Sequence, residues 1–260
     1  MASTRGMTYY WVSRCGVKDA KTLVFTHGLT ADHRMFAPQM EYFRDRYDLI
    51  LWDVPLHGLS RPYSDFSYAH TAEELAAILD AESIVSAVLV GMSMGGYPSQ
   101  AFAEQYPARL AGFVALDTTP FGERYYSRFD LWCLRRATAM TRWMPDGMIR
   151  RLITEGNARS EGGRSILREI LANSTKEQIC EQMEAAYGVF AQENHTITMA
   201  CPTLILIGEH DKTGKVKTYC ENWAENTGWP IIIIPNAAHI SNIDNAPAVN
   251  CAIDDFLNKL

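Results

Sequence analysis

The stretch Val90-Gly91-Met92-Ser93-Met94-Gly95-Gly96 decides how the rest of the chain is interpreted. An apolar, β-branched segment at 84–90 precedes it and is typical of a buried strand. A segment of helix-forming residues at 97–106 follows it and predicts a helix. Ser93 is therefore expected on a tight turn between strand and helix. Glycines two positions before and two positions after it leave room where a side chain would collide with the neighbouring strand or helix.

This pattern, G-x-S-x-G, is the sequence signature of a nucleophile elbow. Such a turn lifts the serine hydroxyl above the sheet and points the free N–H groups of the new helix toward it, which favours a developing negative charge there. Pro98 fits this placement, because proline is tolerated in the first turn of a helix and not deeper. A pattern this short also occurs by chance, so the interpretation depends on the rest of the chain.

Composition excludes several classes of protein. The 260 residues allow one large α/β domain or two small ones, and a content of 47% hydrophobic and 21% charged residues is typical of a globular protein. A net charge of −6 argues against a nucleic-acid partner. No apolar run approaches the roughly 20 residues that span a bilayer, and residues 1–7 lack the apolar core of a secretion signal. The six cysteines are scattered, as in a reducing compartment, so we expect a cytoplasmic protein without an integral membrane segment.

Predicted strands and helices alternate along most of the chain. Besides 84–90, strands are predicted at 8–13, 23–26, 48–54, 110–116, 204–207 and 231–234. Helices are predicted at 35–47, 68–81, 97–106, 215–227 and 246–260. This alternation predicts an α/β fold with a mostly parallel central sheet that is flanked by helices on both faces.

One long segment breaks the alternation. Between 120 and 199 no strand is predicted, and the segment is rich in aromatic residues, methionine and arginine. We expect a helical cap, inserted after the strand that ends near Asp117, over the carboxyl ends of the strands, where ligands bind in this architecture. The predicted division is a core domain of residues 1–119 and 200–260 and a cap of residues 120–199.

A serine is a weak nucleophile unless a base takes its proton and a third group orients the base. His239 follows the predicted strand at 231–234, and Asp211 follows the one at 204–207. The carboxyl ends of parallel strands share one edge of the sheet, so both residues are expected beside Ser93. Asp117, at the end of the strand at 110–116, is the rival for the third group. The context Gly208-Glu209-His210-Asp211 favours Asp211.

Taken together, these motifs resemble the α/β-hydrolase superfamily, in its small cap-bearing esterase, lactonase and haloperoxidase-like branch. They span nearly the whole chain in the order that the superfamily uses, with serine, aspartate and histidine in sequence. Only the cap contains no matching motif. The matching segments are His27-Gly28-Leu29, the loop Asp53…Gly58…Ser60, the elbow at Ser93, Gly208-x-x-Asp211, and His239 followed by a terminal helix.

The resemblance implies a role for each matching residue. Ser93 would be the nucleophile, His239 the general base and then acid, and Asp211 the group that orients His239. The backbone N–H groups of Leu29 and Met94 would form the oxyanion hole. Related dehalogenases and epoxide hydrolases carry an aspartate at the elbow, so a serine there favours acyl transfer.

Three other histidines have simpler interpretations. His27 and His57 are expected to be buried structural residues, and the side chain of His210 is expected to point away from the site. The histidines form no zinc-binding pattern, and the glycines form neither a phosphate-binding loop nor a dinucleotide fingerprint. We therefore expect neither a metal nor a cofactor.

Three functions fit this sequence. The first is hydrolysis of an ester, thioester or lactone of a small to medium organic molecule through an acyl-serine intermediate. The second is hydrolysis of a carbon–carbon bond in a β-diketone-like compound by the same triad. The third is a ligand binder without turnover, against which an intact triad argues.

The cap is expected to line the substrate pocket, with Phe121, Trp132, Trp143 and Tyr187 as candidate lining residues, each of which could equally be packed in the core. Between Phe121 and Arg168 there are ten arginines, no lysine and five acidic residues. Such a segment could attract an anionic substrate or lipid head group, or could be a solvated helical surface. A homodimer through the cap is compatible with the sequence.

Overall fold

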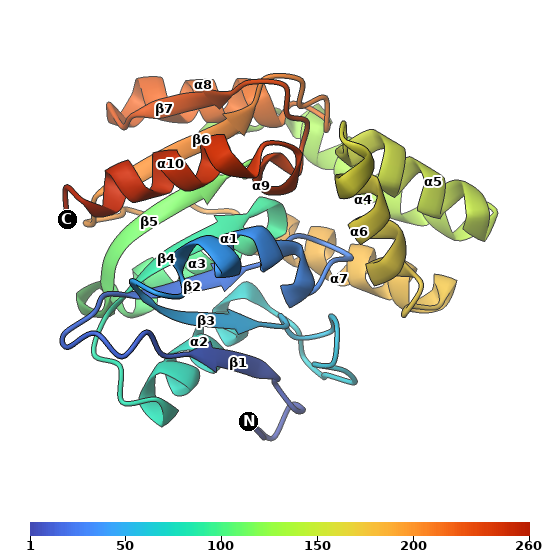
Figure 1. Ribbon diagram of the computed structural model, residues 1–260. Helices are drawn as coiled ribbons and strands as arrows, with labels where there is room; N and C mark the ends of the chain where they lie inside the picture. The colour runs from blue at the N-terminus through green and yellow to red at the C-terminus, as the bar shows by residue number, and fades with distance from the viewer.

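A computed structural model of the chain has a seven-stranded sheet in the order β1-β3-β2-β4-β5-β6-β7 (Figure 1). It describes the backbone of residues 1–260 and all side chains except those of Arg135, Ala137 and Thr138. β1 pairs antiparallel with β3, and the other five pairings are parallel. The predicted mostly parallel sheet is therefore confirmed. The strands are β1 (Tyr10–Ser13), β2 (Thr22–Thr26), β3 (Asp48–Trp52), β4 (Ala87–Met92), β5 (Leu110–Leu116), β6 (Thr203–Gly208) and β7 (Ile231–Ile234).

Helices cover both faces of the sheet, because successive strand residues point to opposite sides. On β2, Leu23 and Phe25 pack toward α1 (Ala37–Phe43) and α10 (Ala246–Leu257). Val24 packs on the other side, toward α2 (Tyr68–Ala81), α3 (Gly96–Gln105) and α8 (Val216–Thr227). The smaller elements are η1 (His33–Phe36), η2 (Ser93–Gly95), η3 (Pro107–Arg109), η4 (Glu123–Tyr125) and α9 (Ser241–Asp244).

Four helices lie between β5 and β6, as predicted for this part of the chain. We call them the inserted helices: α4 (Arg128–Trp143), α5 (Asp146–Asn157), α6 (Glu161–Leu171) and α7 (Lys176–Glu193). Capping boxes formed by Ser127 with Asp130 and by Thr175 with Gln178 define where α4 and α7 begin. Figure 1 shows the inserted helices grouped beyond one end of the sheet. The division into a core and a cap stays a prediction.

The structure shifts some predicted boundaries. The strand predicted at 84–90 runs instead from Ala87 to Met92. The reason is that the N–H of Ile84 donates to the Leu79 carbonyl and closes the end of α2, so Ile84 does not join the sheet. The helix predicted at 35–47 is a short 3-10 helix followed by α1, which ends at Phe43. Among the described residues, no helix is both long and apolar enough to cross a bilayer.

Candidate active site

The serine turn joins β4 to α3 through η2. Ser93 has a φ of +51°, in the left-handed region that few side chains adopt. A Cβ at Gly95 would lie 2.1 Å from the carbonyl oxygen of Thr26, and a Cβ at Gly91 would lie 2.5 Å from the carbonyl oxygen of Gly95. Both contacts are with backbone and cannot be relieved by a side-chain movement. The glycine spacing seen in the sequence is therefore a steric requirement of this turn.

Three side chains from different strand ends form one hydrogen-bonded chain. His239 Nε2 lies 2.8 Å from Ser93 Oγ, and His239 Nδ1 lies 2.8 Å from Asp211 Oδ2. The other carboxylate oxygen, Asp211 Oδ1, accepts from the backbone N–H of Thr213 at 2.8 Å. An ionised carboxylate only accepts, so Nδ1 carries the imidazole proton and Nε2 is left to accept the Ser93 proton. This is the geometry that activation of a serine by a base requires.

Burial and charge set the protonation of His239. Burial disfavours the imidazolium, but the attraction and hydrogen bond of Asp211, with a further contribution from Asp117, outweigh it and raise the pKa of His239. Burial likewise opposes the Asp211 carboxylate, but the attraction of His239 outweighs it and lowers the pKa of Asp211. The site therefore stabilises a His239–Asp211 ion pair.

Asp117, the rival acid, is buried behind this pair and makes other contacts. Its Oδ1 accepts from the N–H of Gly208 at 2.7 Å, and its Oδ2 accepts from the N–H and the hydroxyl of Ser241. Burial and the negative charge of Asp211 raise the pKa of Asp117 to about 7. The structure thus brings Asp211, and not Asp117, into hydrogen-bond contact with His239.

The two residues expected to supply oxyanion donors lie at the same cavity as Ser93. Leu29 and Met94 both line it. His27 holds the loop before Leu29: its Nδ1 donates to the Gly28 carbonyl at 2.8 Å, and its Nε2 accepts from the Val54 N–H at 3.0 Å. Burial lowers the pKa of His27. The ring is thus neutral and built into the backbone, as expected of a structural histidine.

The other two histidines also lie outside the hydrogen-bonded chain. His57 is buried, its Nδ1 lies 3.0 Å from the Pro55 carbonyl oxygen, and burial lowers its pKa to about 3. His210 is partly exposed and lies beside Glu209. Neither ring lines a cavity that contains Ser93.

Two cavities meet at the serine. The larger has a volume of about 470 Å³ and the smaller about 110 Å³. Five residues line both, and so mark their junction: Leu29, Ser93, Tyr187, Thr213 and His239. A carbonyl group attacked by Ser93 would therefore have its two substituents in different cavities.

The larger cavity has mainly aromatic and aliphatic walls. The hydroxyl groups of Tyr97 and Tyr126 both bond to Thr119, which leaves the ring faces to the cavity. Asp130 and Lys215 also line it, but they form an ion pair with each other at 2.7 Å. The described part of the wall thus offers mainly apolar surface.

Of the four aromatic side chains predicted to line the pocket, the structure places only Tyr187 there. Phe121 is buried one layer behind, with its ring stacked on Phe190 at 5.5 Å between centroids. Trp132 stacks on Phe129 at the outer surface, and Trp143 is almost fully exposed. The prediction was wrong for Trp132 and Trp143 because α4 turns them away from the body of the protein, and wrong for Phe121 because it packs against Tyr97 and Phe190, which line the cavity in its place.

Sequence reasoning also missed most of the actual wall. The missed aromatic residues come from five helices (α2, α3, α4, α7 and α8) and from the segment before α4. Only Tyr97 could have been found from the sequence, because it is close to Ser93 in the chain. The missed aromatic residues are Tyr68, Tyr97, Tyr126, Phe129, Phe190 and Tyr219.

Among the described residues, one group of side chains is close enough together to hold a metal ion. Ligand atoms of Asp32, His33 and Asp53 lie within 4.8 Å of one another. Their oxygens are already engaged, however: Asp53 accepts from His33 and the Leu59 N–H, and Asp32 binds Arg34. None of the three lines the cavities at Ser93.

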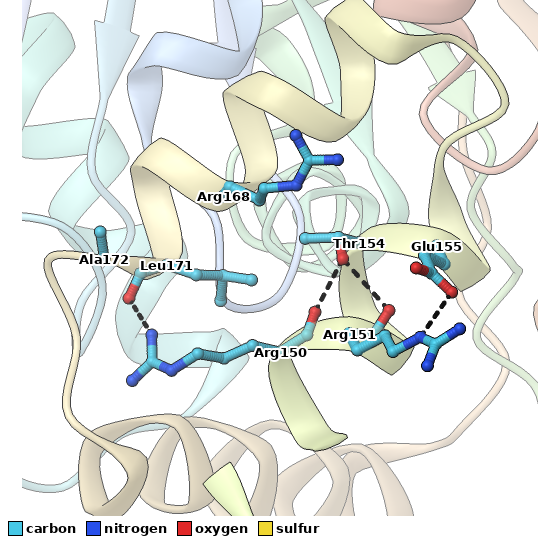
Figure 2. Close-up of a pocket in the computed structure, with 7 residues that line it drawn as sticks. All are labelled: Arg150, Arg151, Thr154, Glu155, Arg168, Leu171 and Ala172. Atoms are coloured by element: carbon cyan, nitrogen blue, oxygen red, sulfur yellow. Dashed lines mark hydrogen bonds and ion pairs between the residues drawn. The ribbon is translucent and has the colours of Figure 1, made fainter. Parts of the chain in front are cut away.

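A third cavity, of about 460 Å³, lies between α5 and α6, and Figure 2 shows its residues. Its arginines already have partners. Arg150 donates to the carbonyls of Leu171 and Ser174, and Arg151 pairs with Glu155. Arg168 pairs with Glu161 outside the cavity. This cavity shares no residue with the two at Ser93.

Comparison with known proteins gives consistent matches. Residues 21–134 match the family model described as alpha/beta hydrolase fold. The 3-oxoadipate enol-lactonase 2 of Acinetobacter baylyi is 26% identical over 94% of this chain and 91% of its own length. A thermophilic esterase from Thermogutta terrifontis superposes with a TM-score of 0.80 at 24% identity, over 97% of this chain and 93% of that one. The enol-lactonase of Burkholderia xenovorans LB400 superposes with a TM-score of 0.78 at 19% identity, over 96% of each chain.

Proposed function

We propose that this chain, which has the α/β-hydrolase fold, cleaves a carboxylic ester, thioester or lactone through an acyl-Ser93 intermediate. The observation that carries this proposal is the hydrogen-bonded chain from Ser93 Oγ through His239 to Asp211. The enol-lactonase and esterase among its relatives support the same class of bond.

The first half of the reaction forms the acyl-enzyme. His239 Nε2 takes the proton from Ser93 Oγ, which attacks the carbonyl carbon of the substrate. The carbonyl oxygen becomes an oxyanion that accepts hydrogen bonds from the backbone N–H groups of Leu29 and Met94. One such donor is worth on the order of 10²–10³ in rate. His239 then gives its proton to the leaving alcohol, thiol or ring oxygen, and the bond to the leaving group breaks.

The second half repeats these steps with water. His239 takes a proton from a water molecule, whose oxygen attacks the acyl carbon, and Ser93 leaves with the proton that His239 returns. Asp211 stabilises the imidazolium in both halves, which agrees with the raised pKa of His239. The products are the carboxylic acid and free enzyme.

The walls of the cavities favour a neutral, apolar substrate. Asp130 and Lys215 neutralise each other in an ion pair. The remaining described wall of the larger cavity is largely aromatic and aliphatic. A free carboxylate on the substrate would lose its water there without gaining a cation, which is costly. We propose that the larger apolar substituent of the ester occupies the larger cavity and the smaller substituent the other.

The test combines a covalent probe with substrates. A fluorophosphonate should label wild-type protein at Ser93, as shown by mapping the modified peptide, and His239→Ala should abolish labelling. Ser93→Ala should also lose hydrolysis of p-nitrophenyl esters by several orders of magnitude. Ser86→Ala, which changes an exposed serine before β4, is the matched control and should retain both fluorophosphonate labelling and ester hydrolysis.

Two results would contradict the proposal. One is well-folded wild-type protein that is not labelled, which favours a ligand binder. The other is turnover of β-diketones but not of aryl esters, which favours carbon–carbon bond hydrolysis by the same residues.

A further inference from the structure

The outward face of α4 carries a stripe of large apolar side chains. Phe129, Trp132, Met140 and Trp143 are 66%, 53%, 67% and 90% exposed. At 100° per residue, their spacing places all four within about 80° of arc on one side of the helix. Arg136 lies within the same arc, with its guanidinium over the Trp132 ring at 5.5 Å. We call these five residues the α4 stripe.

The stripe is not an ordinary scatter of exposed apolar residues. Six of the sixteen exposed large hydrophobic side chains of the described chain fall within residues 128–152, because Met148 and Leu152 of α5 add to the four on α4. A concentration of this kind marks an interaction surface, whereas single exposed apolar residues need no explanation. The other side of α4 is already used: Leu131 and Leu134 line the larger cavity.

The charge around the stripe indicates its partner. Residues 128–152 contain six arginines, no lysine and two aspartates, an excess of four positive charges in a chain whose net charge is −6. Among the described side chains, Asp130 pairs with Lys215, and three of the arginines are ion-paired: Arg142 with Glu184, Arg150 with Asp146 and Arg151 with Glu155. Arg128 and Arg136 are exposed and have no carboxylate partner among the described side chains. The partner is therefore expected to be apolar and negatively charged.

A second copy of the chain fits this surface poorly. A twofold dimer through the stripe would bring the same positive segment against itself. Tryptophan, phenylalanine and methionine beside arginine suit the boundary between the head groups and acyl chains of an anionic bilayer, where the apolar rings enter and the guanidinium groups meet phosphates.

We propose that the α4 stripe docks the protein onto an anionic lipid surface. The stripe also continues into the candidate active site, because Phe129 and the neighbouring Cys133 line the larger cavity. An apolar ester dissolved in the lipid would thus reach Ser93 along α4 without crossing water. This second step rests on the proposed function, whereas the docking itself does not.

Binding is measured by sedimentation with sucrose-loaded vesicles that contain either phosphatidylcholine alone or an equal mixture with phosphatidylglycerol. Wild-type protein should bind the mixed vesicles and not the neutral ones, and binding should weaken as salt is raised. The double variant Met140→Gln/Trp143→Gln should lose most of this binding and still hydrolyse a water-soluble ester at the wild-type rate. Val85→Gln, at an exposed apolar residue before β4, is the matched control and should bind normally.

The arginines are tested separately. Arg128→Gln should weaken binding to mixed vesicles about fivefold, the equivalent of ~1 kcal/mol for one basic residue near an anionic surface. Arg44→Gln, which removes an exposed arginine at the end of α1 and outside the α4 stripe, should leave binding unchanged.

Ser93→Ala protein should bind vesicles as wild type does, so failure of docking and failure of the proposed function are distinguishable. The proposal would be overturned if the protein bound both kinds of vesicle equally well, or if it bound neither kind. A dimer in light scattering that Met140→Gln/Trp143→Gln converts to monomer, without any vesicle binding, would overturn it in favour of a second copy.

Discussion

Replacing Asp211 by asparagine should remove most of the activity through a change in the His239 tautomer. Asp211 Oδ1 accepts from the Thr213 N–H at 2.8 Å, so the asparagine must keep its oxygen at that position. Its NH₂ group then faces His239 Nδ1, which has to accept. The imidazole proton moves to Nε2, where Ser93 needs an acceptor.

The size of the loss follows from burial. His239 is buried, and the change also removes the carboxylate that compensates the imidazolium at 2.8 Å. Removing one partner of a buried ion pair costs about 3–5 kcal/mol. At 1.36 kcal/mol per factor of ten, this corresponds to a loss in kcat/KM of about 10²–10⁴, and the tautomer change places the expected value at the upper end.

The assay is kcat/KM on a p-nitrophenyl ester, with circular dichroism to confirm that each variant is folded. Asp117→Asn is the matched control, because Asp117 is also a buried carboxylate at a strand end but bonds to Gly208 and Ser241 instead of His239. The folded Asp117→Asn protein should lose less than tenfold in kcat/KM. Asp211 is not the group that orients His239 if Asp117→Asn loses as much kcat/KM as Asp211→Asn, or if kcat/KM of Asp211→Asn stays within tenfold of wild type.

Three further outcomes follow from the same contacts. In wild-type protein kcat/KM should rise with pH as His239 loses its proton, and the midpoint of this rise should lie above the ordinary histidine pKa of 6.5. The charge of Asp117 contributes to the raised pKa of His239, so Asp117→Asn should move the midpoint to a lower pH. Gly95→Ala should yield no stably folded protein in a thermal melt, because its Cβ would lie 2.1 Å from a backbone oxygen. Gly188→Ala, whose Cβ would have nothing within 4 Å, should instead gain about 0.5–1 kcal/mol of helix stability and melt about 1–4 °C higher. Ala186→Leu, at a buried residue that lines the larger cavity, should lower kcat/KM for p-nitrophenyl esters of long acyl chains more than for the acetate, and an equal effect on both would argue against the larger cavity as the site of the larger substituent.

The sheet and the serine turn could be predicted from sequence because they depend on local requirements. Strand alternation follows from apolar patterns, and the turn at Ser93 needs glycine at 91 and 95 because backbone occupies the space of a side chain. The placement of Asp211 and His239 needed one further step, that parallel strands end at one edge of the sheet. Each of these features depends only on a residue and on the element that carries it.

The pocket wall could not be predicted in the same way, because it depends on which side of α4 faces inward. That helix carries Leu131 and Leu134 on one side and two tryptophans on the other, so its sequence offers two apolar faces. The larger side chains were candidates for the pocket wall, yet the structure turns the half-buried leucines inward. Only the packing of α4 on the rest of the protein decides between the two faces.

α7 forms part of the wall of the larger cavity and is hydrogen-bonded to the body of the protein. Gln182 on α7 donates to the Leu56 carbonyl at 2.8 Å, and Glu193 at its end accepts from the Tyr68 N–H at 3.0 Å. Both contacts hold α7 against the loop after β3 and the start of α2, and Tyr187 of the same helix lies at the junction of the two cavities. α4 is held by contacts between partly exposed groups: Arg142 pairs with Glu184 of α7, Lys176 Nζ donates to the Arg142 carbonyl, and Asp130 pairs with Lys215 in the loop after Asp211. Exposed ion pairs of this kind contribute at most about 1 kcal/mol each. A substrate that needs more room in the larger cavity is therefore expected to displace α4 before α7, along the same helix whose outer face carries the apolar stripe.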